Sequence, residues 1–121
     1  MTGLVQDKIA IVTGGAKGLG YGISRRLARD GAKLLITGRD GAATERVAAE
    51  IRDEIGTAAF GISADMADKD QVYGMVDRCV AEFGGLDILV TNASALSPNI
   101  LLENKTDEML RETLEIGTWG T

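Results

Sequence analysis

A cluster of glycines near the start of the chain is the stretch best suited to hold a ligand. Five glycines lie between Gly14 and Gly22, in the sequence TGGAKGLGYG. Glycine in an ordered element costs ~0.5–1 kcal/mol relative to alanine, so the cluster indicates unusual dihedrals or a close approach by another group. We expect Gly14 to turn the chain as it leaves a strand. Gly18 and Gly20 are expected to leave room for an anion such as a pyrophosphate, held by the unpaired N–H groups and partial positive charge of a helix N-terminus.

Histidine and tyrosine, two residue types that often transfer protons in catalysis, are absent and rare respectively. The chain has no histidine, which excludes a histidine-based triad or metal site. A tyrosine of pKa ~10 needs a nearby cation to act as an acid at neutral pH. Tyr21 is followed four residues later by Arg25, but it belongs to the helix directly behind the glycine loop, and Tyr73 is followed by Asp77, which has the wrong charge. We therefore predict that both tyrosines are structural, and that the chain holds no catalytic residue and no metal site.

Composition excludes several classes of protein. The 121 residues are 45% hydrophobic and 26% charged, which predicts one globular domain over residues 1–121. The net charge of −5 argues against a nucleic-acid partner. No apolar run reaches the ~18 residues of a membrane span, and residues 1–8 do not resemble a signal peptide. The single cysteine, Cys79, fits a reducing compartment and is predicted to pack in the core, so we expect a cytoplasmic protein.

The elements that must position the glycine loop alternate regularly. Strands followed by helices imply right-handed crossovers, and hence an α/β fold with a doubly wound parallel sheet, for which we predict the strand order 3-2-1-4. Asp68 and Gln71 resemble a capping box at the start of the third helix. In such sheets the ligand lies beyond the carboxyl ends of the strands, here between strands 1 and 4. The predicted strands are 8–13, 33–38, 58–63 and 86–91, and helices are predicted from near 19 to 31, 45 to 56, 68 to 83 and 106 to 116.

Three motifs carry a resemblance to a known family. Residues 13–20 read T-G-x-x-x-G-x-G, which resembles the signature of the short-chain dehydrogenase/reductase family. The sequence ISADMAD at 62–68 is similar to the family's exit from strand 3, and LDILVTNAS at 86–94 is similar to its N-N-A-G segment after strand 4. The resemblance covers essentially the whole chain and implies a Rossmann-like fold, incomplete on its C-terminal side.

The resemblance also implies a function and some of its residues. The family transfers hydride between a nicotinamide cofactor and an alcohol or ketone. By resemblance, Asp65 contacts the adenine ring with Met66 beside it, and Asn92, Ala93 and Ser94 lie near the nicotinamide ribose. This chain departs from the pattern because Ser94 replaces the last glycine of N-N-A-G.

Two further departures concern catalysis. Gly117 stands where the family has an asparagine of the proton relay. The family's catalytic serine and its Y-x-x-x-K pair lie beyond the helix at which these 121 residues stop. We therefore interpret the chain as the cofactor-binding half of such an enzyme, inactive alone. The alternative is a non-catalytic nucleotide-binding module.

The end of the second strand bears on the choice of cofactor. In dinucleotide folds an acidic residue there holds the ribose hydroxyls of NAD. Here that position is Gly38, and Arg39 follows it. Arg39 can bind a 2′-phosphate through forked hydrogen bonds, and Lys17 can supply a second cation, so we predict NADP(H) over NAD(H). The predicted cofactor-binding residues are Thr13, Gly14, Lys17, Gly18, Leu19, Gly20, Arg39, Asp65, Met66, Asn92, Ala93 and Ser94.

The outer side of strand 4 is predicted to attract a partner. This strand should have a neighbour in the complete family fold, so its edge and its apolar residues Ile88 and Val90 are expected to promote association of the 121-residue chain. By resemblance, a homo-oligomer that pairs through the helix starting near Thr106 is also expected. The other expected partners are the nicotinamide dinucleotide and a small alcohol or ketone, with no nucleic acid and no membrane.

Overall fold

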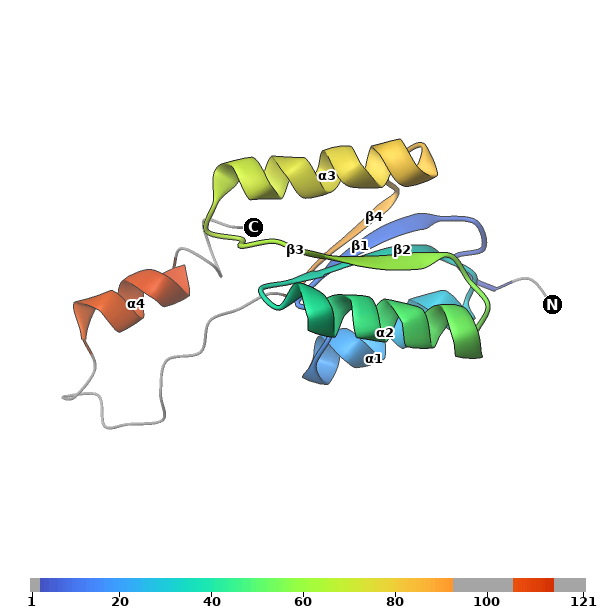
Figure 1. Ribbon diagram of the computed structural model, residues 1–121, viewed down its shortest axis with the longest axis horizontal. Helices are drawn as coiled ribbons and strands as arrows, with labels where there is room; N and C mark the ends of the chain where they lie inside the picture. Colours follow the sequence, from blue (N-terminus) through green and yellow to red (C-terminus); the bar gives the residue numbers. More distant parts are fainter. Residues whose placement is uncertain (1–2, 93–105, 115–121) are drawn as a thin grey trace.

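Four parallel strands form one sheet in the order β3-β2-β1-β4, which confirms the predicted topology (Figure 1). The computed structural model describes residues 3–92 and 106–114. Its elements are β1 (Ile9–Thr13), α1 (Gly18–Arg29), β2 (Lys33–Gly38), α2 (Gly41–Glu54), β3 (Ala59–Ser63), α3 (Lys69–Phe83), β4 (Ile88–Thr91) and α4 (Asp107–Leu114).

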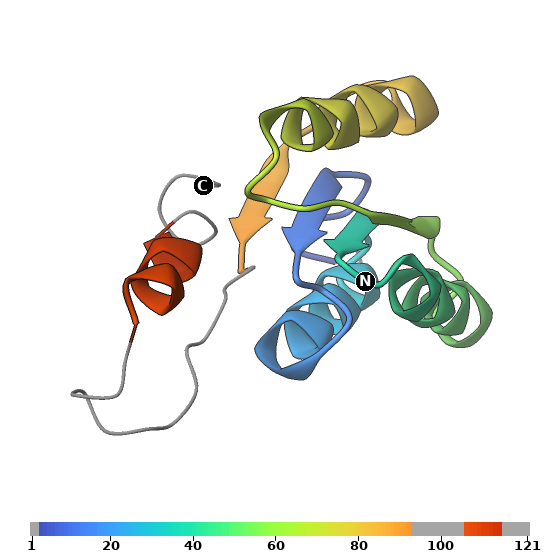
Figure 2. The same cartoon turned by 60° about the vertical axis from the view of Figure 1, so that its left-hand side comes forward.

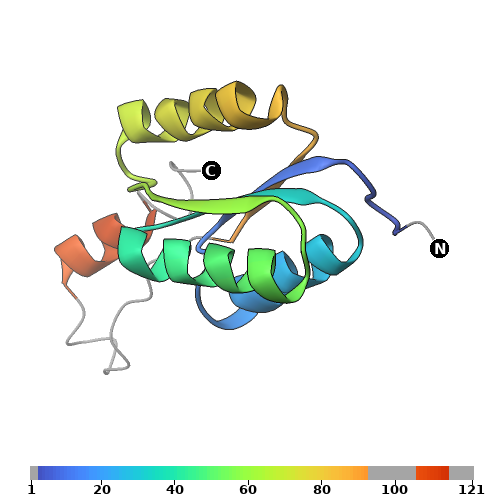
Figure 3. The same cartoon turned by 45° about the vertical axis from the view of Figure 1, so that its right-hand side comes forward.

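Helices cover both faces of the sheet. Helices α1 and α2 lie against one face and α3 lies against the other, as Figures 2 and 3 show from two directions. Because successive side chains of a strand point to opposite faces, Val12 joins a buried cluster with Ile51 of α2. Ile11, one residue earlier, joins the opposite cluster with Met75 and Cys79 of α3. Burial on both faces explains why β1 and β2 read as continuous apolar runs.

Cys79 has the core position predicted for it. Its side chain is fully buried, and its Sγ donates to the carbonyl oxygen of Gly85 at 3.5 Å. Burial raises the pKa of the Cys79 thiol, because the thiolate would lose solvation. The thiol is therefore held in its neutral, unreactive form.

Side chains cap the N-termini of three helices. The Asp68 carboxylate accepts hydrogen bonds from the backbone N–H groups of Asp70 and Gln71 at 3.0 and 3.3 Å, and from the Gln71 side chain at 3.1 Å, so Asp68 caps α3 as predicted. The reciprocal bond of a capping box is not formed, because the backbone N–H of Asp68 donates to Asp65 and the Gln71 side-chain oxygen accepts from Asp65 instead. Asp40 caps α2 and Thr106 caps α4 in the same way. Helix α1 has no side-chain cap. The N–H groups of its first turn are thus available to another acceptor.

The outer edge of β3 is covered by side chains from α2. The Glu45 carboxylate accepts from the backbone N–H of Gly61 at 3.0 Å, and Arg52 donates to the carbonyl oxygen of Ala59 at 2.6 Å. Arg52 and Glu45 also pair with each other at 2.7 Å. Burial alone would raise the pKa of Glu45, but the Gly61 N–H and the Arg52 guanidinium outweigh it, and the pKa is lowered. Two of the outward backbone groups of β3, the Gly61 N–H and the Ala59 carbonyl oxygen, are thereby occupied and less open to pairing with another strand.

The opposite edge of the sheet, at β4, has different chemistry. No strand among the described residues pairs with its outer side. Leu89 of β4 is 48% exposed, and Val80 of the neighbouring α3 is 46% exposed. The described part of the sheet is therefore protected at one edge and apolar at the other.

Candidate functional site

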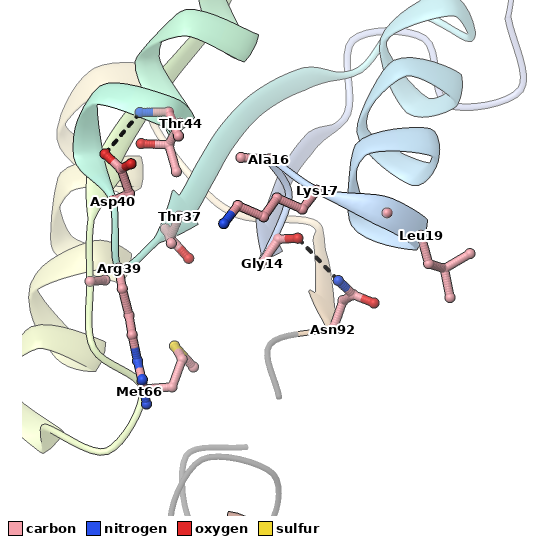
Figure 4. Close-up of a pocket in the computed structure, with 14 residues that line it drawn as sticks. Gly14, Ala16, Lys17, Leu19, Thr37, Arg39, Asp40, Thr44, Met66 and Asn92 are labelled. Carbon is pink, nitrogen blue, oxygen red and sulfur yellow. Dashed lines mark hydrogen bonds between the residues drawn. The ribbon is translucent and has the colours of Figure 1, made fainter. Parts of the chain in front are cut away.

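A cleft of about 630 Å³ lies at the carboxyl ends of the strands, the edge at which the sequence predicts ligand binding. It extends from Asn92, which follows β4, across the glycine loop to Met66, which follows β3 (Figure 4). The cleft therefore reaches further across the sheet than the predicted crevice between strands 1 and 4. The residues that line it are Gly14, Ala16, Lys17, Gly18, Leu19, Thr37, Gly38, Arg39, Asp40, Ala43, Thr44, Ala64, Met66 and Asn92.

The glycine loop turns back onto the end of β2. Gly14 has a φ of +65°, a left-handed conformation that favours glycine, so the predicted turn at this residue is confirmed. The backbone N–H groups of Gly14 and Gly15 both donate to the carbonyl oxygen of Thr37, at 2.8 and 3.3 Å. These two hydrogen bonds hold the loop against the carboxyl end of β2.

Gly18 opens α1 toward the cleft. Its φ is +51°, and a Cβ built on it would meet no atom within 4 Å. Gly18 lines the cleft, and no side chain caps the backbone N–H groups of the first turn of α1. This arrangement matches the donor set that binds phosphate at a helix N-terminus.

Gly20 makes a close contact within the fold. We expected its missing side chain to leave room for a ligand, but Gly20 does not line the cleft. A Cβ at this position would lie 2.1 Å from the carbonyl oxygen of Gly14 and 2.5 Å from Nδ2 of Asn92. Gly20 is thus required for the close packing of α1 against the loop and the end of β4.

Thr13 and Asn92 join the ends of β1 and β4. The Thr13 hydroxyl donates to the carbonyl oxygen of Val90 at 3.2 Å and accepts from the backbone N–H of Asn92 at 3.0 Å. Asn92 in turn donates from Nδ2 to the carbonyl oxygen of Gly14 at 3.1 Å. Thr13 is buried and does not line the cleft, whereas Asn92 does. This network fixes the glycine loop relative to β4.

Lys17, Arg39 and Met66, which are all predicted to bind the cofactor, line the same cleft. Lys17 extends from the glycine loop, and Arg39 lies with Met66 on the side formed by the ends of β2 and β3 (Figure 4). The Ser63 hydroxyl donates to the backbone carbonyl of Arg39 at 3.0 Å and so holds this turn. Leu19, which is 74% exposed, lies at the opposite side with Asn92.

Asp65 is, after Gly20 and Thr13, a third predicted binding residue that does not line the cleft. Asp65 lies between the lining residues Ala64 and Met66 but does not line the cleft itself. Its carboxylate accepts from the backbone N–H of Ala67 at 2.9 Å, and its own N–H donates to the Gln71 side chain at 2.8 Å. Asp65 therefore stabilises the turn that follows β3. Ala93, Ser94 and Gly117 lie outside the described residues.

Sequence reasoning missed several lining residues at the end of β2 and the start of α2, among them Thr37, Asp40 and Thr44. A polar residue that ends an apolar strand was the available signal for Thr37. Asp40 and Thr44 could not be recognised in this way, because their side chains are used in local structure. Asp40 caps α2 at Ala43, and the Thr44 hydroxyl donates to the carbonyl oxygen of Gly41 at 2.9 Å.

Neither tyrosine is placed to act in the cleft. The Tyr21 hydroxyl donates to Glu50, which also pairs with Arg25 at 2.6 Å. The hydrogen bond to Glu50 raises the pKa of Tyr21, because a phenolate would lie beside the carboxylate. Tyr73 is 59% exposed on α3. Within the described ranges, no group of three or more potential metal ligands gathers at one place, and no helix is long and apolar enough to cross a bilayer.

Comparison with known proteins gives consistent matches. The family model described as short chain dehydrogenase matches residues 8–121. Cis-4-hydroxycyclohexanecarboxylate dehydrogenase from Sinomonas cyclohexanicum is 37% identical over 114 residues, which cover 94% of this chain and 45% of that protein. The chain spans about half the length, or less, of the curated relatives it matches.

Solved structures show the same likeness. A short chain dehydrogenase from Burkholderia cenocepacia in complex with NADP has a TM-score of 0.87 and 40% sequence identity, and the match covers 96% of this chain and 47% of that one. The 3-ketoacyl-(acyl-carrier-protein) reductase from Brucella melitensis, complexed with NADH, has a TM-score of 0.88 and 34% identity, with coverage of 96% and 46%.

Proposed function

Because the chain belongs to the short-chain dehydrogenase family, we propose that it forms the dinucleotide site of an oxidoreductase acting on an alcohol or ketone. The observation that carries the proposal is the cleft in front of α1, where an uncapped helix N-terminus opens at Gly18 and the cations Lys17 and Arg39 line the same cleft. Similar structures that contain NADH and NADP support the class of ligand. When bound, the nicotinamide cofactor supplies or accepts the hydride.

The residues of the cleft divide into two parts along its length. The glycine loop and the first turn of α1 would hold the pyrophosphate at the centre, with Gly14 and Gly18 allowing its close approach. Arg39 and Met66 would contact the adenosine half, with Asp65 supporting the turn behind Met66. Leu19 and Asn92 lie on the opposite side and would contact the nicotinamide half, which Ala93 and Ser94 are proposed to extend.

The charge of the adenosine side favours NADP(H). Gly38 offers no carboxylate for the ribose hydroxyls, while Arg39 and Lys17 line the cleft and can bind a 2′-phosphate. Asp40 also lines the cleft, but its carboxylate accepts from the backbone N–H of Ala43 at the N-terminus of α2. The positive end of that helix offsets the charge of Asp40, so it opposes a phosphate only weakly.

Titration of the protein with NADPH and NADH tests this preference. Arg39→Ala and Lys17→Ala should each weaken NADPH binding by about 10-fold or more, since a charge-assisted hydrogen bond contributes ~1.5–3 kcal/mol. NADH binding should change little. Arg29→Ala is the matched control, because this exposed arginine lies in the last turn of α1 and does not line the cleft. Equal affinities for the two cofactors, unchanged by Arg39→Ala, would contradict the preference.

For the 121-residue polypeptide we propose nucleotide binding without turnover. Positioned acid–base groups contribute ~10²–10⁴-fold to such reactions, and the described tyrosines offer none in the cleft. A panel of ketones and secondary alcohols, followed by nicotinamide absorbance, should show no enzymatic rate. Turnover that disappears in Tyr21→Phe would show that Tyr21 is the proton donor after all.

The alternative is a nucleotide-binding module with no catalytic role. The intact mass of the natural protein separates the two, because the curated relatives are about twice as long as the matched segment or longer. A longer protein that carries Y-x-x-x-K supports the enzyme, and one that ends at residue 121 supports the module. A cytoplasmic location and assembly into a homo-oligomer belong to the same proposal and rest on the family resemblance.

A further inference from the structure

The hydroxyl of Thr37 has an unusual environment. Among the buried side-chain oxygen and nitrogen atoms in the described part of the chain, it is the one without a hydrogen-bond partner. The residue is fully buried. A hydroxyl removed from water with no partner destabilises the fold, so each such group in a native structure needs an explanation.

Thr37 lines the cleft near the end of β2, two residues before Arg39. Figure 4 shows its side chain on the cleft side of the strand end, between Lys17 and Met66. Its backbone carbonyl is already used, because it accepts the N–H groups of Gly14 and Gly15. The hydroxyl therefore lies beside the junction of the glycine loop with the proposed adenosine side of the cleft.

Thr13 provides a direct comparison. It is the register partner of Thr37 on the neighbouring strand, and both side chains are buried. The Thr13 hydroxyl has a donor and an acceptor partner within the fold, Asn92 and Val90. Two threonines in matching positions thus differ in one respect: the fold supplies partners for Thr13 and none for the hydroxyl of Thr37 among the described residues.

We propose that the Thr37 hydroxyl donates a hydrogen bond to an acceptor atom in the adenosine half of the bound dinucleotide, and that Thr37 is a further binding residue of this cleft. The inference rests on the proposed function. Because the hydroxyl is covered in the structure, the side chains around it must rearrange when the nucleotide enters. Binding then satisfies a group that the protein alone leaves without a partner.

Thr37→Val tests this with two readouts of opposite sign. Valine has the shape of threonine without the hydroxyl, so the variant should melt about 4 °C or more above the unsubstituted protein when no nucleotide is present. Its Kd for 2′,5′-ADP, a probe of the adenosine half, should rise by about 5-fold. Binding of nicotinamide mononucleotide, which lacks that half, should not change.

Two further variants serve as controls. Thr37→Ser keeps the hydroxyl and should retain the affinity for 2′,5′-ADP. Thr13→Val removes a hydroxyl that has partners and should lower the melting temperature. A Thr37→Val protein that binds 2′,5′-ADP as tightly as the unsubstituted protein, or that is less stable, overturns the inference while the cofactor site stands. An unsubstituted protein that binds neither NADPH nor 2′,5′-ADP overturns the proposed function itself.

Discussion

Replacing Gly20 by alanine should destabilise the protein, whereas the same change at Gly22 should stabilise it. Both glycines belong to α1, and alanine is the better helix former by ~1 kcal/mol in a helix interior. Their surroundings differ. A Cβ at Gly22 would meet nothing within 4 Å, but one at Gly20 would lie 2.1 Å from the carbonyl oxygen of Gly14.

The distances set the size of the effect. Ordinary contacts of a Cβ begin at 3.4 Å, so α1 or the glycine loop would have to move by more than 1 Å to admit alanine at position 20. The contacted atoms are mainly backbone, which cannot swing aside. Overpacking of this kind costs ~1–3 kcal/mol, so we expect a net loss of about 1 kcal/mol for Gly20→Ala after the gain in helix propensity. Gly22→Ala should gain about 0.5–1 kcal/mol.

Thermal unfolding followed by circular dichroism measures both changes. At ~4–8 °C per kcal/mol for a domain of this size, Gly20→Ala should lower Tm by about 5 °C and Gly22→Ala should raise it by about 4 °C. Gly20→Ala should also weaken NADPH binding, because Gly14 and Asn92 line the cleft, while Gly22→Ala should not. Equal stabilities for the two variants would refute the packing argument.

Two further predictions concern the edges of the sheet. Because the pKa of Glu45 is lowered in the fold, its contribution to stability is present above its ordinary pKa and is lost as the pH falls through the folded value. Glu45→Gln should therefore lose less stability than the unsubstituted protein on acidification from about pH 5, in urea titrations at several pH values; parallel losses would argue against this role. The 121-residue polypeptide should self-associate at tens of micromolar in sedimentation experiments, and Leu89→Lys on β4 should weaken that association by about 10-fold, since a charge at an edge strand opposes pairing. A monodisperse unsubstituted monomer would contradict this.

The sequence alone was sufficient for the order of the strands and the position of the glycine loop. Apolar runs separated by helical periodicity determine a parallel sheet almost without alternatives, because crossovers are right-handed and both faces must be covered. The turn at Gly14 and the cap at Asp68 were equally readable, since each depends on a local conformation that few residue types supply. The presence of Lys17, Arg39, Met66 and Asn92 in one cleft followed from the same topology.

Long-range packing was beyond the sequence. Nothing in the order of residues shows that Gly20 contacts Gly14 and Asn92, since that contact depends on how α1 lies across the ends of β1 and β4. The role of Asp65 was obscured for a similar reason, because its carboxylate is used by the turn that follows β3. The missing partner of Thr37 emerges only after every neighbouring donor and acceptor has been assigned.

The contacts of Glu45 and Arg52 with β3 make the two edges of the sheet unequal in their ability to accept a further strand. At β3 the extension of the sheet is blocked at two backbone groups, because the backbone N–H of Gly61 and the carbonyl oxygen of Ala59 are already hydrogen-bonded to side chains of the same molecule. Within the described residues, the outer edge of β4 is not paired with another strand and can accept one. Among the described residues, the edge beside Leu89 is therefore the more open to a further strand, and two molecules that pair there each cover the open edge of the other. Association through this edge should accordingly stop at pairs and should not continue into fibres.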